Sequence, residues 1–143
     1  NNIDVFYTPN SKSEPNILSK IASGGEKSRI LFAIKSALAN KINLPTLVFD
    51  EIDSGMSGEI ANTIGKMMKT IGSKIQIISI SHLPQVASRA DHHFKVFKSN
   101  INDNIVSNIT ELNGQDRINE IASMISGEKI TESAINQARE LLK

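Results

Sequence analysis

The sequence has 143 residues, of which 39% are hydrophobic and 22% are charged, values that place it among globular proteins with a single core. A formal net charge of +1 means that any nucleic-acid contact would need a local patch, because the chain offers no overall positive field. The chain has no cysteine, which excludes disulfides, thiolate metal sites and cysteine nucleophiles.

No apolar run approaches the roughly 20 residues that a membrane-spanning helix needs, and no signal-peptide pattern opens the chain. We therefore expect a cytoplasmic protein without a membrane partner. The chain begins with Asn1 rather than Met, and we expect it to be cut from something longer.

The first part of the chain predicts one short strand and one helix. Residues 3–7 alternate apolar and polar side chains and end at a turn signal, which predicts the strand. Residues 26–40 have apolar side chains at helical spacing, which predicts a helix that packs on the core through that face. The predicted face comprises Ile30, Leu31, Ile34, Ala37 and Leu38.

Residues 46–80 predict a strand, a helix and a second strand. The short apolar run 46–49 is typical of a buried parallel strand. The following helix has Ser57 as its expected N-cap and Gly72 as its expected stop. Residues 75–80 are rich in strand formers, so the order favours a right-handed parallel crossover.

The last third of the chain predicts a different arrangement. Residues 93–98 and 105–112 predict an antiparallel strand pair, and residues 115–125 predict a helix that Gly127 can close. A last helix is expected from about Glu132, capped by Thr131. We expect one α/β domain over residues 1–143, with a mainly parallel sheet flanked by helices and the antiparallel pair near its end.

The run Ser23-Gly24-Gly25-Glu26 lies at the start of the first predicted helix. Its glycines let backbone N–H groups approach an anion, and the positive end of the helix dipole points the same way. The run is therefore typical of a phosphate-binding loop, although Gly-Gly also occurs in caps and turns that bind nothing.

Two acids, Asp50 and Glu51, follow the first apolar strand. In nucleotide hydrolysis such acids hold Mg²⁺ and polarise water, because the strand end opens into the crevice where phosphates bind. Asp50 would hold the metal, largely through water, and Glu51 would orient or deprotonate the attacking water. His82, at the end of the next strand, could reach the γ-phosphate or the same water. The alternative is that the acids only begin a solvated loop and that His82 is an ordinary surface or core histidine.

Two other histidines carry no predicted chemistry. His92 and His93 are adjacent and would point to opposite faces of a strand, so they cannot easily share a metal. We find no candidate zinc site in the sequence.

Together these segments resemble the signature loop, the Walker B strand and the switch histidine of ABC-type ATPases, in the family's order. The similarity is greatest to the SMC-like branch, and within it to the C-terminal part of a bacterial DNA repair protein. It covers essentially the whole chain and is carried by residues 21–26, 49–58, 81–87, 125–127 and 130–134. The resemblance implies the P-loop NTPase fold, as the C-terminal lobe of an ABC ATPase head.

The resemblance also implies ATP and Mg²⁺ as ligands and assigns a role to each site residue. The implied catalytic residues are Glu51 and His82, the metal ligand is Asp50, and the nucleotide-binding residues are Ser23, Gly24, Gly25, Glu26, Asp53 and Ser54. The signature loop would act across a head-to-head dimer, whereas the residues after the two strands would serve the nucleotide of their own head. Residues 53–57 match the D-loop, which couples the two sites in the family, but Ser57 stands where transporters and many SMC proteins have an acid.

One family motif is missing. No Gly-x-x-x-x-Gly-Lys-Ser/Thr occurs, and residues 25–28 resemble only its tail. No heptad pattern extends over several repeats, so the sequence shows no part of the family's coiled coil either. We therefore expect a lobe that lacks the Walker A half, needs that N-terminal lobe as a partner, and does not hydrolyse ATP alone.

The resemblance thus implies half of an ATP-driven machine for repair and recombination at DNA double-strand breaks, associated with the nucleoid. It would reach DNA through the full-length protein, since Lys and Arg are scattered rather than striped. Two alternatives stay open. One is a non-catalytic interaction module, against which the presence of Glu51 and His82 counts. The other is a transporter nucleotide-binding fragment, against which Ser57 and the terminal helices count.

Overall fold

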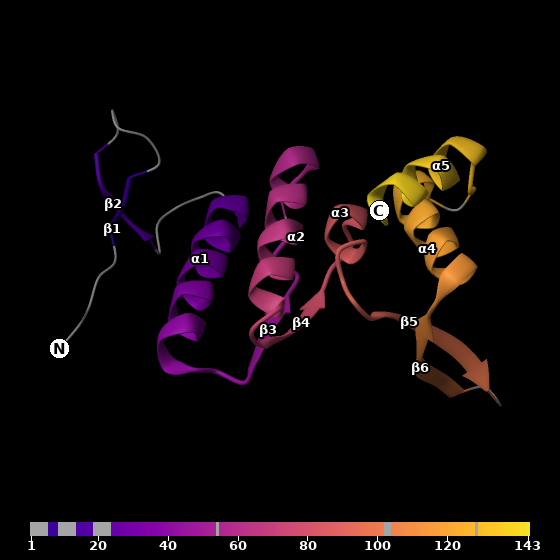
Figure 1. The fold of residues 1–143 in the computed structure, drawn as a ribbon, viewed down its shortest axis with the longest axis horizontal. Helices are drawn as coiled ribbons and strands as arrows, with labels where there is room; N and C mark the ends of the chain where they lie inside the picture. Colours follow the sequence, from indigo (N-terminus) through magenta and orange to yellow (C-terminus); the bar gives the residue numbers. More distant parts are fainter. Residues whose placement is uncertain (1–5, 9–13, 19–23, 54, 102–103, 128) are drawn as a thin grey trace.

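The computed structural model describes residues 6–8, 14–18, 24–53, 55–101, 104–127 and 129–143. Figure 1 shows an elongated arrangement in which helices line one side and the two longer strand pairs lie along the other. Among the described helices, none combines the length and the apolar character that a bilayer crossing requires. In chain order the elements are β1 (Phe6–Tyr7), β2 (Asn16–Ile17), α1 (Gly24–Ile42), β3 (Thr46–Asp50), α2 (Gly58–Gly72), β4 (Gln76–Ile80), α3 (Pro84–Ala87), β5 (His93–Ile101), β6 (Asn104–Leu112), α4 (Gly114–Ser126) and α5 (Glu132–Leu141).

The described strands form three two-stranded sheets. β3 and β4 are parallel, in register from Thr46 opposite Gln76 to Asp50 opposite Ile80, and α2 connects them along the chain. β5 and β6 form an antiparallel hairpin, and β1 and β2 form a short antiparallel pair. The predicted parallel pair and the predicted antiparallel pair near the end of the chain are both confirmed.

The main core lies between the β3–β4 pair and helices α1, α2 and α3. At its centre the rings of Phe32 and Phe49 lie 5.1 Å apart at a tilt of 41°, a favourable geometry for aromatic side chains. The buried members of this core are Phe32, Ala39, Leu47, Phe49, Ile52, Met56, Ile64, Met68 and Val86.

The face of α1 that packs on this core is not the predicted one. Leu31, Ile34 and Leu38 of the predicted face are 48%, 42% and 49% exposed, whereas Phe32 and Ala39 are buried. Because α1 has apolar side chains on two faces, helical spacing does not select between them. The observed face packs because its aromatic ring meets a ring of the sheet and its small residue lets the helix come close.

One face of the parallel pair is open, so the predicted buried strand is buried on its other face only. Leu47 and Phe49 are buried, whereas Val48, Ile78 and Ile80 are 48%, 48% and 54% exposed. Successive side chains of a strand point to opposite faces, so these exposed residues lie on the face away from the core. Parallel sheets are ordinarily covered on both faces, and this one has an apolar surface that the described part of the chain leaves uncovered.

The helix ends follow the predictions in three of four places, and the first of these is Ser57, the N-cap of α2. The Thr131 hydroxyl accepts from the Ala134 N–H at the start of α5, and Gly127 ends α4 with a φ of 76°. The predicted stop at Gly72 is wrong by one residue, because Gly72 is still helical and Ser73 is the C-cap of α2. A cap prediction from sequence places the end of a helix only to within a residue or two.

A second core joins α4 and α5 and is linked to the first by α3. Its buried members are Ile121, Ala122, Ala134 and Ala138. Ala87 of α3 packs on this second core, whereas its neighbour Val86 belongs to the first. On the other side α3 approaches α2 closely, since a Cβ on Gly65 would lie 2.8 Å from the Gln85 carbonyl oxygen. The short helix that follows His82 is therefore packed between both parts of the molecule.

Candidate active site

The carboxyl ends of β3 and β4 bring Asp50, Glu51 and His82 to one edge of the parallel pair. Asp50 is the register partner of Ile80, and the Glu51 N–H donates to the Ile80 carbonyl oxygen at 3.1 Å. His82 follows two residues after the end of β4. All three side chains are exposed, so this edge presents two carboxylates and an imidazole to a ligand.

The backbone at Glu51 adopts an uncommon conformation. Its φ is +46°, in the left-handed region, and Asn43 is the one other described non-glycine residue with a positive φ. Residues held in sparsely populated backbone regions cluster at active sites, because the surrounding structure must compensate for their cost.

Asp53 lies inside the fold beneath this edge. It is 0% exposed, and its Oδ2 accepts a hydrogen bond from the Ser81 hydroxyl. The Ser81 hydroxyl also accepts from the Leu83 N–H at 3.1 Å. The Nδ1 of His82 lies 3.7 Å from Asp53 Oδ1, and the imidazole side chain is 65% exposed. The turn after β3 and the turn after β4 are thus tied together through one buried carboxylate.

The N-terminus of α1 meets the same turn from the other side. A Cβ on Gly25 would lie 2.8 Å from the Gly55 carbonyl oxygen, and Gly55 has a φ of +72°. Gly25 is buried, whereas Gly24 is exposed with nothing near its Cβ position, and Glu26 is half-exposed in the first turn of α1. An acid in this turn favours the helix dipole. Ser23 and Ser54, two further predicted site residues, lie outside the described residues.

Gly25→Ala is expected to lower the free energy of unfolding by about 1–3 kcal/mol, as overpacking of a close contact does. The added methyl group would collide with backbone rather than with a movable side chain. Gly24→Ala is the matched control, because its Cβ meets no atom within 4 Å. Urea unfolding of both variants, followed by circular dichroism, measures the difference. Equal losses in the two variants would contradict the Gly25–Gly55 contact.

His92 and His93 lie apart from this edge, at the start of the β5–β6 hairpin. His92 is exposed, with its Nδ1 2.7 Å from Glu111 Oε1. Burial lowers the pKa of His93 below its ordinary value of 6.5, and the nearby Arg117 lowers it further. The unfolded chain binds a proton at this position more readily, so His93 reduces stability as the pH falls below 6.5.

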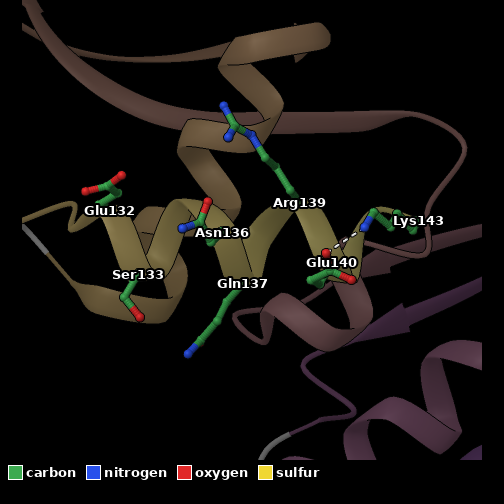
Figure 2. A pocket seen from close by; sticks show the side chains of 7 residues that line it. All are labelled: Glu132, Ser133, Asn136, Gln137, Arg139, Glu140 and Lys143. Carbon is green, nitrogen blue, oxygen red and sulfur yellow. Dashed lines mark hydrogen bonds and ion pairs between the residues drawn. The ribbon is translucent and has the colours of Figure 1, made fainter.

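A shallow hollow of about 660 Å³ lies along α5, and Figure 2 shows its lining. The lining residues are Glu132, Ser133, Asn136, Gln137, Arg139, Glu140 and Lys143. They all come from α5 and from Lys143, two residues beyond its end, and Lys143 is paired with Glu140 at 2.6 Å. The hollow is therefore the solvent face of α5, and it includes none of the predicted site residues.

Comparison with known proteins shows what the chain is similar to. No protein-family model matches the chain. It is 44% identical over 141 residues to the DNA repair protein RecN of Rickettsia bellii and 45% identical over 143 residues to that of Rickettsia conorii. The chain is homologous to a C-terminal segment of RecN. The two matches cover 97% and 99% of the chain but 26% of each relative, so the chain spans about a quarter of the RecN proteins it matches.

Solved SMC heads share the fold of this chain. A structure from a study of ATP-driven dimerization and DNA-stimulated activation of SMC ATPases aligns with a TM-score of 0.65 at 19% identity, over 90% of this chain and 76% of that one. The SMC head domain from Thermotoga maritima aligns with a TM-score of 0.53 at 30% identity, over 71% of this chain and 36% of that one. The predicted resemblance to an SMC-like ATPase head and to a bacterial DNA repair protein is confirmed.

The chain offers one carboxylate suited to a metal at the strand edge. Within the described residues, no group of three or more His, Asp or Glu side chains could hold a metal ion. Mg²⁺ in nucleotide sites is commonly bound through one or two carboxylates, water and the phosphates themselves, so a dedicated protein cage is not required. The exposed carboxylate of Asp50 fits that description.

Two residues at this edge of the parallel pair have contacts that the sequence does not predict. Ser81, which bonds Asp53, was visible only as the residue before His82, and Gly55, which meets Gly25, only as a loop glycine. Both contacts join segments about 30 residues apart, and no local pattern encodes which of them meet. The Asp53–Ser81 bond depends on the pairing of β3 with β4, and the Gly25–Gly55 contact depends on how α1 packs against the turn after β3.

Proposed function

We propose that residues 1–143 form a single domain, the C-terminal lobe of an ATP-hydrolysing head in a RecN-type protein that repairs DNA double-strand breaks. The observation that carries this proposal is that Asp50, Glu51 and His82 share one edge of the parallel pair. Homology to RecN supports the role in DNA repair, and the SMC-head fold supports chemistry on ATP.

In this proposal each residue of the edge has one task. Asp50 holds Mg²⁺, which neutralises charge on the phosphates when it is bound with ATP. Water attacks the γ-phosphorus, its proton passes to the Glu51 carboxylate, and the bond to the bridging oxygen of ADP breaks. His82, which is largely exposed, hydrogen-bonds the γ-phosphate or the attacking water. The N-terminus of α1, with Ser23, Gly24, Gly25 and Glu26, binds the γ-phosphate held by a second head.

The proposal requires two partners and a route to DNA. The N-terminal Walker A lobe of the same protein supplies the phosphate-binding loop that this sequence lacks. The exposed apolar face formed by Val48, Ile78 and Ile80 supports docking of such a lobe. A second head joins when ATP binds, by analogy with the ATP-driven dimerization named for an SMC neighbour. The rest of the full-length protein binds the DNA. The protein is cytoplasmic and associated with the nucleoid.

Reconstitution tests the proposal. The chain alone should hydrolyse no ATP, and mixing it with the N-terminal lobe of Rickettsia conorii RecN should restore Mg²⁺-dependent hydrolysis, measured as phosphate release. A stable mixture without hydrolysis would favour a non-catalytic interaction module. Glu51-dependent turnover by the chain alone would contradict the need for the second lobe.

A further inference from the structure

The carboxylate of Asp53 lies near His82, and one of its two oxygens accepts no hydrogen bond among the described residues. The side chain is fully buried, and its Oδ2 is occupied by the Ser81 hydroxyl. Its Oδ1 is also buried and has no hydrogen-bond partner among the described residues. The ionic partner that the structure gives this oxygen is His82 Nδ1, at 3.7 Å.

An unpaired buried carboxylate oxygen is costly, because it has lost its water and gained no donor. The separation of 3.7 Å is too long for a hydrogen bond, but it is within reach of a small rotation of the ring. The imidazole is 65% exposed, so few contacts oppose that rotation. A hydrogen bond from the Nδ1–H of this ring to Asp53 Oδ1 would therefore be favourable.

The carboxylate is held in place while the ring is free to move. Ser81 is fixed between the Asp53 carboxylate and the Leu83 N–H, which lies at the start of α3. The Asp53 carbonyl oxygen accepts from the Met56 N–H at 3.0 Å, which fixes the other end of the residue. A rigid acceptor beside a mobile ring is the arrangement in which a second residue sets the orientation of a histidine.

We propose that Asp53 is a positioning residue for His82. It keeps the proton on Nδ1, so that Nε2 points outward and is the nitrogen that bonds the phosphate or the attacking water. Asp53 then acts on the nucleotide through His82, since a fully buried side chain offers no surface to a ligand. The role of Nε2 rests on the proposed function, whereas the tautomer does not.

The tautomer can be measured without nucleotide or partner lobe, from the ¹⁵N chemical shifts of the His82 ring at alkaline pH, where the ring is neutral. Neutral histidine in water prefers Nε2–H, but His82 should show Nδ1–H. In Asp53→Asn the amide oxygen stays on the Ser81 hydroxyl and the NH₂ group faces Nδ1, so the ring should switch to Nε2–H. His82→Gln assigns the signals, and Asp116→Asn, an exposed acid on α4, should change nothing at His82.

Ser81→Ala is the second variant, because it keeps the Asp53 charge and releases its anchor. In Ser81→Ala the His82 ring should be a mixture of the two tautomers. This variant tests the proposal if Asp53→Asn fails to fold. An Nε2–H ring in the parent chain, or the same tautomer in the parent and in Asp53→Asn, would overturn the proposal.

Hydrolysis by the reconstituted head adds a separate readout. Asp53→Asn should lower kcat by about 10- to 100-fold, as the loss of an orienting partner typically does, with little change in KM for ATP. Unchanged kcat in a variant that switches tautomer would overturn the catalytic part of the proposal. If the head reconstituted with the unsubstituted chain is also inactive, the proposed function is refuted. The tautomer result does not depend on that activity.

Discussion

Replacing Glu51 with glutamine should reduce ATP hydrolysis by the reconstituted head at least about 100-fold, the usual effect of losing a general base. The amide has nearly the same shape but cannot accept the proton of the attacking water. The side chain is exposed, and the hydrogen bond to β4 comes from the backbone N–H, so the strand edge should stay intact. Phosphate release measures the rate, and retained ATP binding shows that the site has survived.

Glu59→Gln is the matched control for this experiment. Glu59 is also exposed and lies in the first turn of α2, outside the proposed phosphate edge. Its substitution should leave hydrolysis unchanged. If Glu51→Gln retained most of the parent's activity while binding ATP normally, Glu51 would not be the base and the assignment of this edge would fail.

Phe49→Ala should lower the free energy of unfolding by about 3–5 kcal/mol, the range for removing a large buried aromatic side chain. Phe49 is 0% exposed and packs against Phe32, and the Lys35 ammonium lies 5.7 Å from its ring centroid. The substitution removes these contacts and opens a cavity at the centre of the main core. Since the free energy of unfolding of a domain is only about 5–15 kcal/mol, the substitution should remove a large part of it.

Urea unfolding of the chain, followed by circular dichroism, measures this effect. The matched control is Phe94→Ala, which removes the same group from a side chain that is 53% exposed on β5. It should cost within about 0.5 kcal/mol, as surface substitutions usually do. Similar losses in the two variants would mean that Phe49 is not the centre of the core.

The amino-acid sequence was sufficient for the order of the elements from α1 onward, whereas the short strand β2 was not predicted. The apolar run before Asp50, the helical spacing of residues 57–72 and the strand formers before His82 are local signals. Two parallel strands joined by one helix bring their carboxyl ends together, so the meeting of Asp50 and His82 follows from that order. The cap at Thr131 and the stop at Gly127 were also readable, because each depends on a few neighbouring residues.

The packing of these elements was not readable from the sequence. α1 has two apolar faces, and only contact with the sheet selects Phe32 over Leu31. The open face at Val48 and Ile78 depends on what surrounds the strands, and an apolar run is the same whether one face or both are covered. The Asp53–Ser81 bond joins residues 28 positions apart, so it exists only once β3 and β4 have paired in register. Local patterns specify which element forms, whereas burial and long-range hydrogen bonds depend on which elements meet.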